Sequence, residues 1–155
     1  MKRAFVRPYV LALRSYFGRA KLPLSRLVNR LRPKSMLELP EFGSLEEFAS
    51  WMKDHLRWRL DRLGGMLDVF PSLEYVAWQL EHKGTVEDDC DGLAFVAARG
   101  ALRLADAPED VYVVTLVLNP VSMPLNRAAH VICVFRRGGR WYVVSNGQID
   151  ARHYP

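Results

Sequence analysis

The sequence predicts an α+β fold in which N-terminal helices pack on an antiparallel β-sheet. Two observations support this prediction. Apolar residues recur at helical spacing through much of the first 104 residues, whereas from Asp110 onward Val-rich segments are typical of strands. The pair Gly138-Gly139 separates two of these segments and is typical of a hairpin turn. A chain of 155 residues is long enough for one domain with an ordinary core.

The distribution of charge divides the chain in two. Residues 1–34 contain ten Lys or Arg and no Asp or Glu, so the formal net charge of +5 comes from this segment. The other 121 residues contain 12 basic and 17 acidic residues, a net charge of −5. We therefore expect a basic N-terminal arm and linker at residues 1–40 and a folded domain at residues 41–155.

Part of the arm has the pattern of a short amphipathic helix. Leu24, Leu27, Val28 and Leu31 recur at helical spacing, and the arginines lie off that stripe. Four roles stay open for residues 1–34. The segment could contact an anionic membrane surface, a polyanion such as nucleic acid, or a protein partner. It could also pack its leucines on the chain's own domain.

Nothing in the sequence is typical of a membrane span or a secretory signal. No apolar run approaches the roughly 18–20 residues that a transmembrane helix needs, and the run from Tyr9 to Leu13 is too short and too close to arginine for a signal peptide. The two cysteines, Cys90 and Cys133, form no disulfide framework. Such sparse use of cysteine is typical of a reducing compartment, so we expect a cytoplasmic protein.

Three helices are expected before the sheet. The first begins after Ser44, whose capping-box partner is Glu47, and runs to Leu63 before a Gly-Gly pair. The second lies between the cap Ser72 and the stop Gly84. The third runs from about residue 90 to residue 104 and has Ala and Gly in its interior, so it is expected to be central and buried. The first helix also carries a second stripe, either core or a stacking platform, formed by Trp51, His55 and Trp58.

Three strands are expected after these helices, at residues 110–119, 129–137 and 140–146. Along the second strand, the two-residue period puts His130 on one face and Cys133 on the other. Cys133 is therefore expected to be an inert core residue.

Cys90 begins the third helix among four acidic residues, Glu87, Asp88, Asp89 and Asp91. Three interpretations compete: a metal ligand, a small structural residue and a catalytic nucleophile. A calcium loop starting at Glu87 would have Ala98 where a bidentate Glu is required. No other Cys or His is near enough in sequence to form a recognisable zinc-ligand pair. We therefore expect neither a metal nor a cofactor.

The position of Cys90 favours a nucleophile, because the unpaired N–H groups and the dipole of a helix N-terminus stabilise a thiolate. Asp88 or Asp89 is expected to cap this helix, which would engage one negative charge with backbone N–H groups. A thiolate also needs a cationic partner, and His130 is the histidine that begins a strand. The alternative is a hydrogen-bonded strand histidine without a catalytic role.

A catalytic triad requires a third residue that orients the imidazole. Folding the last two strands about Gly138-Gly139 brings Ser145 and Asn146 level with His130. Asn146 could accept a hydrogen bond from the imidazole N–H through its side-chain carbonyl. The predicted catalytic residues are therefore Cys90, His130 and Asn146, with Ser145 as the alternative third member.

Three segments together resemble the transglutaminase-like cysteine peptidase superfamily, relatives of papain, over about residues 71–150. They are Asp88-Asp89-Cys90-Asp91 at a helix start, His130-Val131 at a strand start, and the hairpin strand Trp141-Tyr142-Val143-Val144-Ser145-Asn146. The resemblance implies a papain-like fold with the nucleophile at the N-terminus of a central helix, in a bacterial or phage member. The sequence departs from the family pattern where Asp88 replaces a Gly and Ser145 replaces an Asp.

The resemblance also implies a function. It is that of a cysteine hydrolase or acyl transferase acting on amide bonds of a protein or peptide, as a peptidase, an amidase or a transglutaminase. Gln79 is a further candidate for oxyanion stabilisation. Because Ser145 replaces the usual Asp, the alternative is a non-catalytic member of the same fold, which would be a binding or structural module acting through its basic N-terminal arm.

Overall fold

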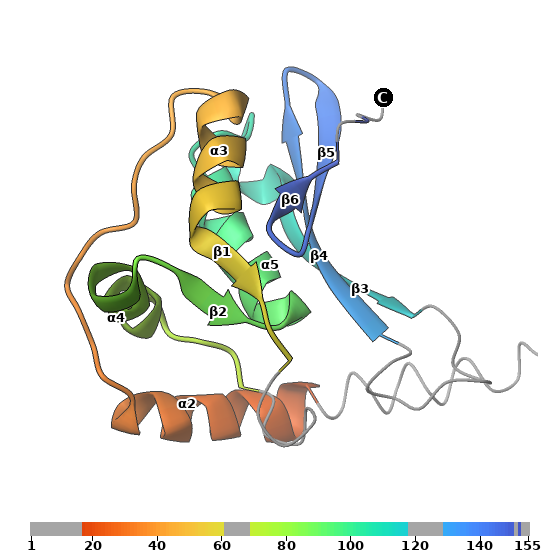
Figure 1. The fold of residues 1–155 in the computed structure, drawn as a ribbon. Helices are drawn as coiled ribbons and strands as arrows, with labels where there is room; N and C mark the ends of the chain where they lie inside the picture. The colour runs from red at the N-terminus through yellow and green to blue at the C-terminus, as the bar shows by residue number, and fades with distance from the viewer. Residues whose placement is uncertain (1–16, 61–68, 118–128, 151, 153–155) are drawn as a thin grey trace, which may run out of the picture.

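The computed structural model describes residues 17–60, 69–117, 129–150 and 152, and the predicted α+β class is confirmed (Figure 1). The described helices are α2 (Leu22–Leu31), α3 (Leu45–His55), α4 (Leu73–Lys83) and α5 (Cys90–Ala101). A π-helical turn, η1 (Phe17–Lys21), leads into α2, and a 3-10 turn, η2 (Pro108–Asp110), precedes the main sheet. Within the described residues, no helix has both the length and the apolar character needed to cross a membrane.

The main sheet is antiparallel and has the strand order β3-β4-β5-β6. Its strands are β3 (Val111–Val117), β4 (Ala129–Arg137), β5 (Arg140–Ser145) and β6 (Gln148–Ile149). Gly138 and Gly139 join β4 to β5 with φ angles of 57° and 74°, the left-handed values that such a tight hairpin requires. The three predicted strands are therefore confirmed, although residues 118–119 of the first lie outside the described residues. The short edge strand β6 was not predicted.

The predicted first helix is wrong beyond α3. Leu56 is extended, with φ −95° and ψ 129°, and begins β1 (Leu56–Trp58), which pairs in parallel with β2 (Val86–Asp88). The guanidinium of Arg57 donates to the carbonyl of Lys53 and so helps to close the end of α3. Because Leu56 is buried, its position in the leucine pattern reflects a core strand and not a further helical turn. The end of that prediction, at Leu63, lies outside the described residues.

The predicted helix caps are confirmed. The Glu47 N–H donates to Ser44 Oγ at 3.1 Å at the start of α3. Likewise, the Tyr75 N–H donates to Ser72 Oγ at 3.2 Å at the start of α4. Gly84 ends α4 in the left-handed conformation.

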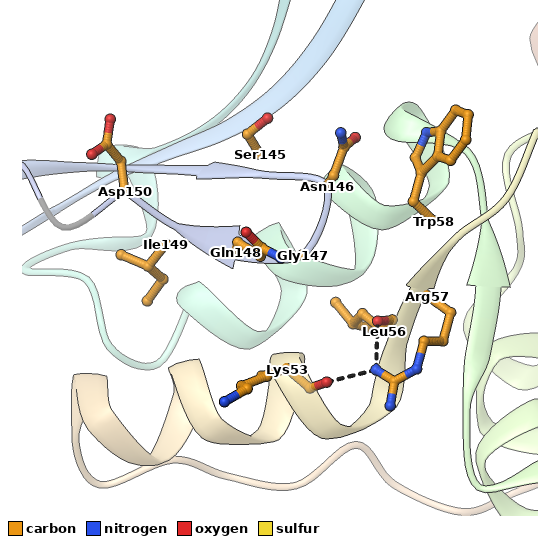
Figure 2. A pocket seen from close by; sticks show the side chains of 10 residues that line it. All are labelled: Lys53, Leu56, Arg57, Trp58, Ser145, Asn146, Gly147, Gln148, Ile149 and Asp150. Atoms are coloured by element: carbon orange, nitrogen blue, oxygen red, sulfur yellow. Dashed lines mark hydrogen bonds between the residues drawn. The ribbon is translucent and has the colours of Figure 1, made fainter.

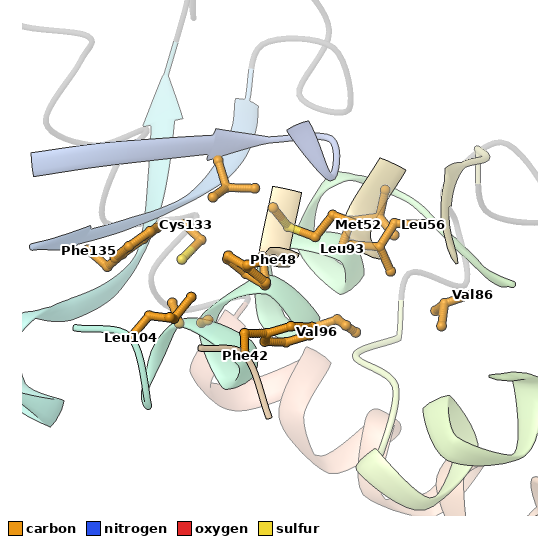
Figure 3. Close-up of a cluster of buried hydrophobic side chains, with 14 of the residues drawn as sticks. Phe42, Phe48, Met52, Leu56, Val86, Leu93, Val96, Leu104, Cys133 and Phe135 are labelled. Atoms are coloured by element: carbon orange, nitrogen blue, oxygen red, sulfur yellow. The ribbon is translucent and has the colours of Figure 1, made fainter. Parts of the chain in front are cut away.

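α5 occupies the centre of the fold, where it packs against β4, β3 and β5. Phe48 of α3 contacts Phe135 of β4 edge to face, with ring centroids 6.3 Å apart (Figure 3). A Cβ atom at Gly100 of α5 would lie 2.6 Å from the Phe48 ring, so the lack of a side chain there lets α3 and α5 approach closely. The third predicted helix is therefore buried and central, although it ends at Ala101 and not at residue 104.

α2 lies against the rest of the molecule through polar side chains. The Phe70 N–H donates to Ser25 Oγ at 3.0 Å, and Asn29 Nδ2 donates to the Phe70 carbonyl at 2.8 Å. The ammonium of Lys21 forms an ion pair with the Asp91 carboxylate in α5, and both side chains are buried. The same ammonium lies 4.2 Å from the centre of the Phe70 ring. Part of the basic arm therefore contacts the helix that begins at Cys90.

Candidate active site

Cys90 is the first residue of α5, and its neighbours shape the start of that helix. Asp89 is the N-cap, because its Oδ1 accepts the Asp91 N–H at 3.2 Å. Asp88 Oδ1 accepts the Asp89 N–H at 2.9 Å, and a Cβ atom at Gly92 would lie only 2.3 Å from Asp88 Cγ. The predicted cap is thus confirmed as Asp89. The half-buried Cys90 thiol stands at the positive end of a capped helix.

Carboxylate oxygens of Asp88, Asp89 and Asp91 lie within 4.8 Å of one another. Protein groups already engage them. Asp88 and Asp89 accept backbone N–H groups, and Asp91 is paired with Lys21. These contacts satisfy part of the hydrogen-bonding and charge requirements of the three carboxylates. They also mean that three negative charges beside Cys90 are partly compensated.

His130 lies near the start of β4, and its Nε2 is 2.8 Å from Ser145 Oγ in β5. The hydroxyl can accept the Nε2–H, which leaves Nδ1 as the ring nitrogen for a thiol. The structure therefore joins His130 to Ser145, the alternative third member. Asn146, the first choice, is exposed and has a φ of 49° in the tight turn to β6. A catalytic role for either residue stays a prediction.

We infer that α5, which starts at Cys90, and β4, which starts next to His130, start at the same end of the layer that they form. At the other end, the Asp106 N–H donates to the Arg136 carbonyl at 2.8 Å, and the Gly138-Gly139 turn donates two N–H groups to the Asp106 carboxylate at 2.7 and 3.0 Å. From this fixed end, α5 extends back to Cys90 by about 17 Å. β4 extends back from Arg136 to His130 by about 20 Å. The thiol–imidazole contact itself stays a prediction.

Cys133 has an environment unlike that of Cys90. It is fully buried in β4, within the core cluster. Burial raises the pKa of its thiol to about 12, because a thiolate would lose its hydration there. The prediction that Cys133 is a core residue is therefore confirmed.

A groove of about 640 Å³ opens beside Ser145 (Figure 2). One wall comes from the end of α3 and from β1, and the other comes from β5, β6 and the turn between them. Trp58 lines the first wall and is paired in strand register with Asp88, two residues before Cys90. Ser145 lines the second wall and contacts His130. Each wall is thus linked to one of the predicted catalytic residues.

The aromatic stripe predicted for the first helix is divided between two elements. Trp51 and His55 lie on α3 with their ring centroids 5.4 Å apart, and Trp51 packs against the core. Trp58 lies in β1, is 54% exposed and lines the groove. The core interpretation therefore fits Trp51, whereas Trp58 is available to a ligand.

Gln79 is buried in α4, and its Oε1 accepts the Glu87 N–H of β2 at 3.3 Å. Its Nε2 has no hydrogen-bond partner within the part of the chain that the structure describes. Since this amide is buried, a substrate arriving from solvent does not reach it in this conformation. Gln79 thus joins α4 to β2, and its role in oxyanion stabilisation stays a prediction.

Two residues near the site were not singled out for these contacts from the sequence. Lys21 belongs to the arm, and no local pattern indicates that one lysine of a basic segment is buried against Asp91. Arg57 also lines the groove, but its position gave no signal because residues 56–58 were expected to be helical. Both contacts depend on segments that are distant in sequence.

Comparisons of the chain with protein-family models, with curated proteins and with solved structures found no match. The functional assignment therefore rests on the residues of this chain and their geometry.

Proposed function

We propose that the chain is a transglutaminase-like cysteine hydrolase or acyl transferase that acts on amide bonds. The observation that carries the proposal is the 2.8 Å contact between His130 Nε2 and Ser145 Oγ. This contact supports an imidazole that is held in one orientation at the start of β4. In this proposal Cys90 is the nucleophile, His130 is the base, and Ser145 orients His130.

The chemistry follows from these roles. The Cys90 thiolate attacks the carbonyl carbon of an amide, and a C–S bond forms. The protonated His130 gives its proton to the departing amine as the C–N bond breaks, which leaves a thioester. His130 then removes a proton from water or from an acceptor amine, which attacks the thioester and releases Cys90. Water gives a peptidase or amidase, and an amine gives a transglutaminase.

The groove of Figure 2 is the substrate-binding surface in this proposal. Trp58 offers an exposed apolar ring on one wall, and Asn146 and Gln148 offer amide groups on the other. A peptide in an extended conformation needs both kinds of contact, apolar area for its side chains and hydrogen-bonding groups for its backbone. A protein or peptide substrate therefore fits better than a small apolar molecule.

The test compares the wild type with Cys90→Ala and His130→Ala. Each protein is incubated with casein and a fluorescent primary amine, and both peptide release and amine incorporation are measured. We expect wild-type turnover in one of these reactions and loss of turnover in both variants, with circular dichroism showing an intact fold. Turnover that persists in either variant contradicts the proposed roles.

A second candidate function is a non-catalytic binding module of the same fold. It is favoured by the acidic residues beside Cys90, because Asp88 and Asp91 are buried there and negative charge opposes a thiolate. This candidate predicts no turnover by the wild type. It also predicts that the reactivity of the Cys90 thiol does not change when His130 is replaced. The two candidates therefore give opposite results in the same experiments.

A further inference from the structure

The leucine pattern of α2 suggests that its apolar side faces the body of the protein, but a polar stripe faces the body instead. Lys21, the last residue of η1, and Ser25 and Asn29 of α2 are spaced four residues apart and face the body of the protein, where they contact Asp91 and Phe70. In a helix with about 100° between successive residues, a side chain two positions from Ser25 points to the opposite side. The polar stripe of α2 is therefore occupied by the protein, and another stripe faces outward.

The outward stripe is apolar. Pro23, Leu27 and Leu31 follow one another at four-residue spacing, and all three are exposed. Leu27 is 58% exposed and Leu31 is 85% exposed. Leu27 and Leu31 therefore do not pack on the described domain, whereas Leu24 and Val28, the other two residues of the predicted stripe, are half-buried. The segment after α2 adds two exposed apolar side chains, Met36 and Leu37.

Cations border this stripe. Arg26 and Arg30 are exposed and lie on α2 between the apolar stripe and the stripe that faces the body. Arg19 and Lys34 are exposed at either end of the helix. The first acidic residue of the whole chain is Glu38, so no carboxylate within α2 opposes an anionic surface.

We propose that α2 is a membrane-surface anchor that binds anionic phospholipid. Its leucines would enter the boundary between headgroups and acyl chains, while Arg26 and Arg30 meet the phosphates. The helix is already formed and held by Lys21, Ser25 and Asn29. Binding therefore does not require the segment to fold first.

An anionic lipid surface fits α2 better than the other partners. Nucleic acid would satisfy the arginines but would leave Leu27 and Leu31 in water, because its backbone offers phosphates and no apolar layer. A lipid surface offers both components in the same geometry, apolar acyl chains beneath and phosphates level with the helix. A protein partner, or a second copy of this chain, is an outcome of the test.

The test is co-sedimentation of the full chain with vesicles of phosphatidylcholine, with and without phosphatidylglycerol. We expect binding to the anionic vesicles, weaker binding at high salt, and little binding to phosphatidylcholine alone. Leu27→Gln/Leu31→Gln keeps good helix formers but should lower vesicle affinity at least about 100-fold, because two leucines no longer leave water. Arg26→Gln/Arg30→Gln should lower it about 30-fold.

A matched control removes two exposed apolar side chains elsewhere. Leu60→Gln/Val113→Gln changes residues that are 57% and 45% exposed and lie outside α2, so its vesicle binding should equal that of the wild type. Absence of wild-type binding to anionic vesicles overturns the proposal. It is also overturned if the leucine variant binds like the wild type, which leaves charge attraction alone. Self-association that depends on Leu27 and Leu31 without vesicle binding identifies a second copy as the partner and overturns it too.

Discussion

The imidazole of His130 is oriented by a neutral hydroxyl, and this affects the strength of the proposed ion pair with Cys90. A carboxylate would stabilise an imidazolium by its charge, whereas Ser145 Oγ offers a neutral hydrogen bond at 2.8 Å. Such a bond contributes about 1 kcal/mol. We therefore expect the Cys90–His130 ion pair to hold a smaller fraction of thiolate than a pair whose histidine is supported by a carboxylate.

Ser145 and Asn146 are neighbours with different expected effects, so they form a matched pair. Ser145→Ala should slow alkylation of Cys90 by iodoacetamide below pH 7 about fivefold, because loss of the hydrogen bond costs about 1 kcal/mol. Asn146→Ala should leave the rate unchanged. Mass spectrometry of the labelled peptides measures both rates. A loss confined to Asn146→Ala reverses this assignment.

Cys133 gives a prediction about stability, because its pKa of about 12 in the folded protein exceeds the usual thiol value of about 8.5. The stability that the neutral thiol contributes is fully present below the pKa that the thiol has in the unfolded chain. It is lost as the pH rises from that pKa toward the pKa of the folded protein. Between pH 8 and pH 10, wild-type stability should fall by about 1–2 kcal/mol more than that of Cys133→Ala. Urea unfolding under reducing conditions measures this, and equal pH dependence in the two proteins contradicts it.

The choice between Ser145 and Asn146 shows how far the sequence determines the site. Counting residues from the Gly138-Gly139 turn identified Ser145 as a neighbour of His130, which the 2.8 Å contact confirms, but it did not separate Ser145 from Asn146. The pair Asn146-Gly147 is itself typical of a tight turn. That turn takes Asn146 out of the strand at a φ of 49° and leaves Ser145 as the last residue of β5.

At the scale of elements, the parallel pair β1–β2 shows why local patterns fail. Leucines in residues 56–63 continue a helical spacing, and no local residue forbids another turn. The alternative is stabilised by β2, which lies about 30 residues later and pairs with Leu56, Arg57 and Trp58. The energy of such pairing depends on tertiary contacts, so periodicity did not reveal it.

The ion pair between Lys21 and Asp91 should hold α2 on the body. Lys21→Met leaves the Asp91 carboxylate buried without its cation, which should cost about 3–5 kcal/mol of unfolding free energy. Lys21→Met/Asp91→Leu replaces the pair by apolar side chains and should recover most of that loss. Urea denaturation provides the three free energies.

Lys34→Met is the control for this series, because Lys34 is an exposed lysine of the same segment. Its effect on stability should stay within about 0.5 kcal/mol. If Lys21→Met costs no more than Lys34→Met, the ion pair does not anchor α2.

At the scale of the whole molecule, the position of the groove predicts that its walls affect the alkylation rate of Cys90 by a peptide reagent but not by a small reagent. Trp58→Ala removes an exposed ring from one wall. It should slow alkylation by a peptidyl chloromethyl ketone severalfold but leave the rate with iodoacetamide unchanged, because only the peptide occupies the groove. Tyr112→Ala, which removes an exposed ring from β3, is the control and should change neither rate. Equal slowing of both reagents by Trp58→Ala places the ring at the thiol and not in a substrate groove.

The order of helices followed by an antiparallel sheet was predictable, because the period of the apolar residues changes along the chain. The capped start of α5 was predictable too, since Asp89 is a good N-cap beside a run of small residues. The position of α2 was not predictable. It depends on a buried lysine and on polar contacts with Phe70, and neither produces a local pattern.

The most direct test of the central claim is the pH dependence of Cys90 alkylation by iodoacetamide in the wild type and in His130→Ala, with buried Cys133 as the internal control. A thiolate–imidazolium pair predicts a wild-type rate that is already high below pH 7 and that falls when His130 is removed. A Cys90 that reacts like an ordinary thiol of pKa about 8.5, or not at all, and that is unaffected by His130→Ala contradicts the claim.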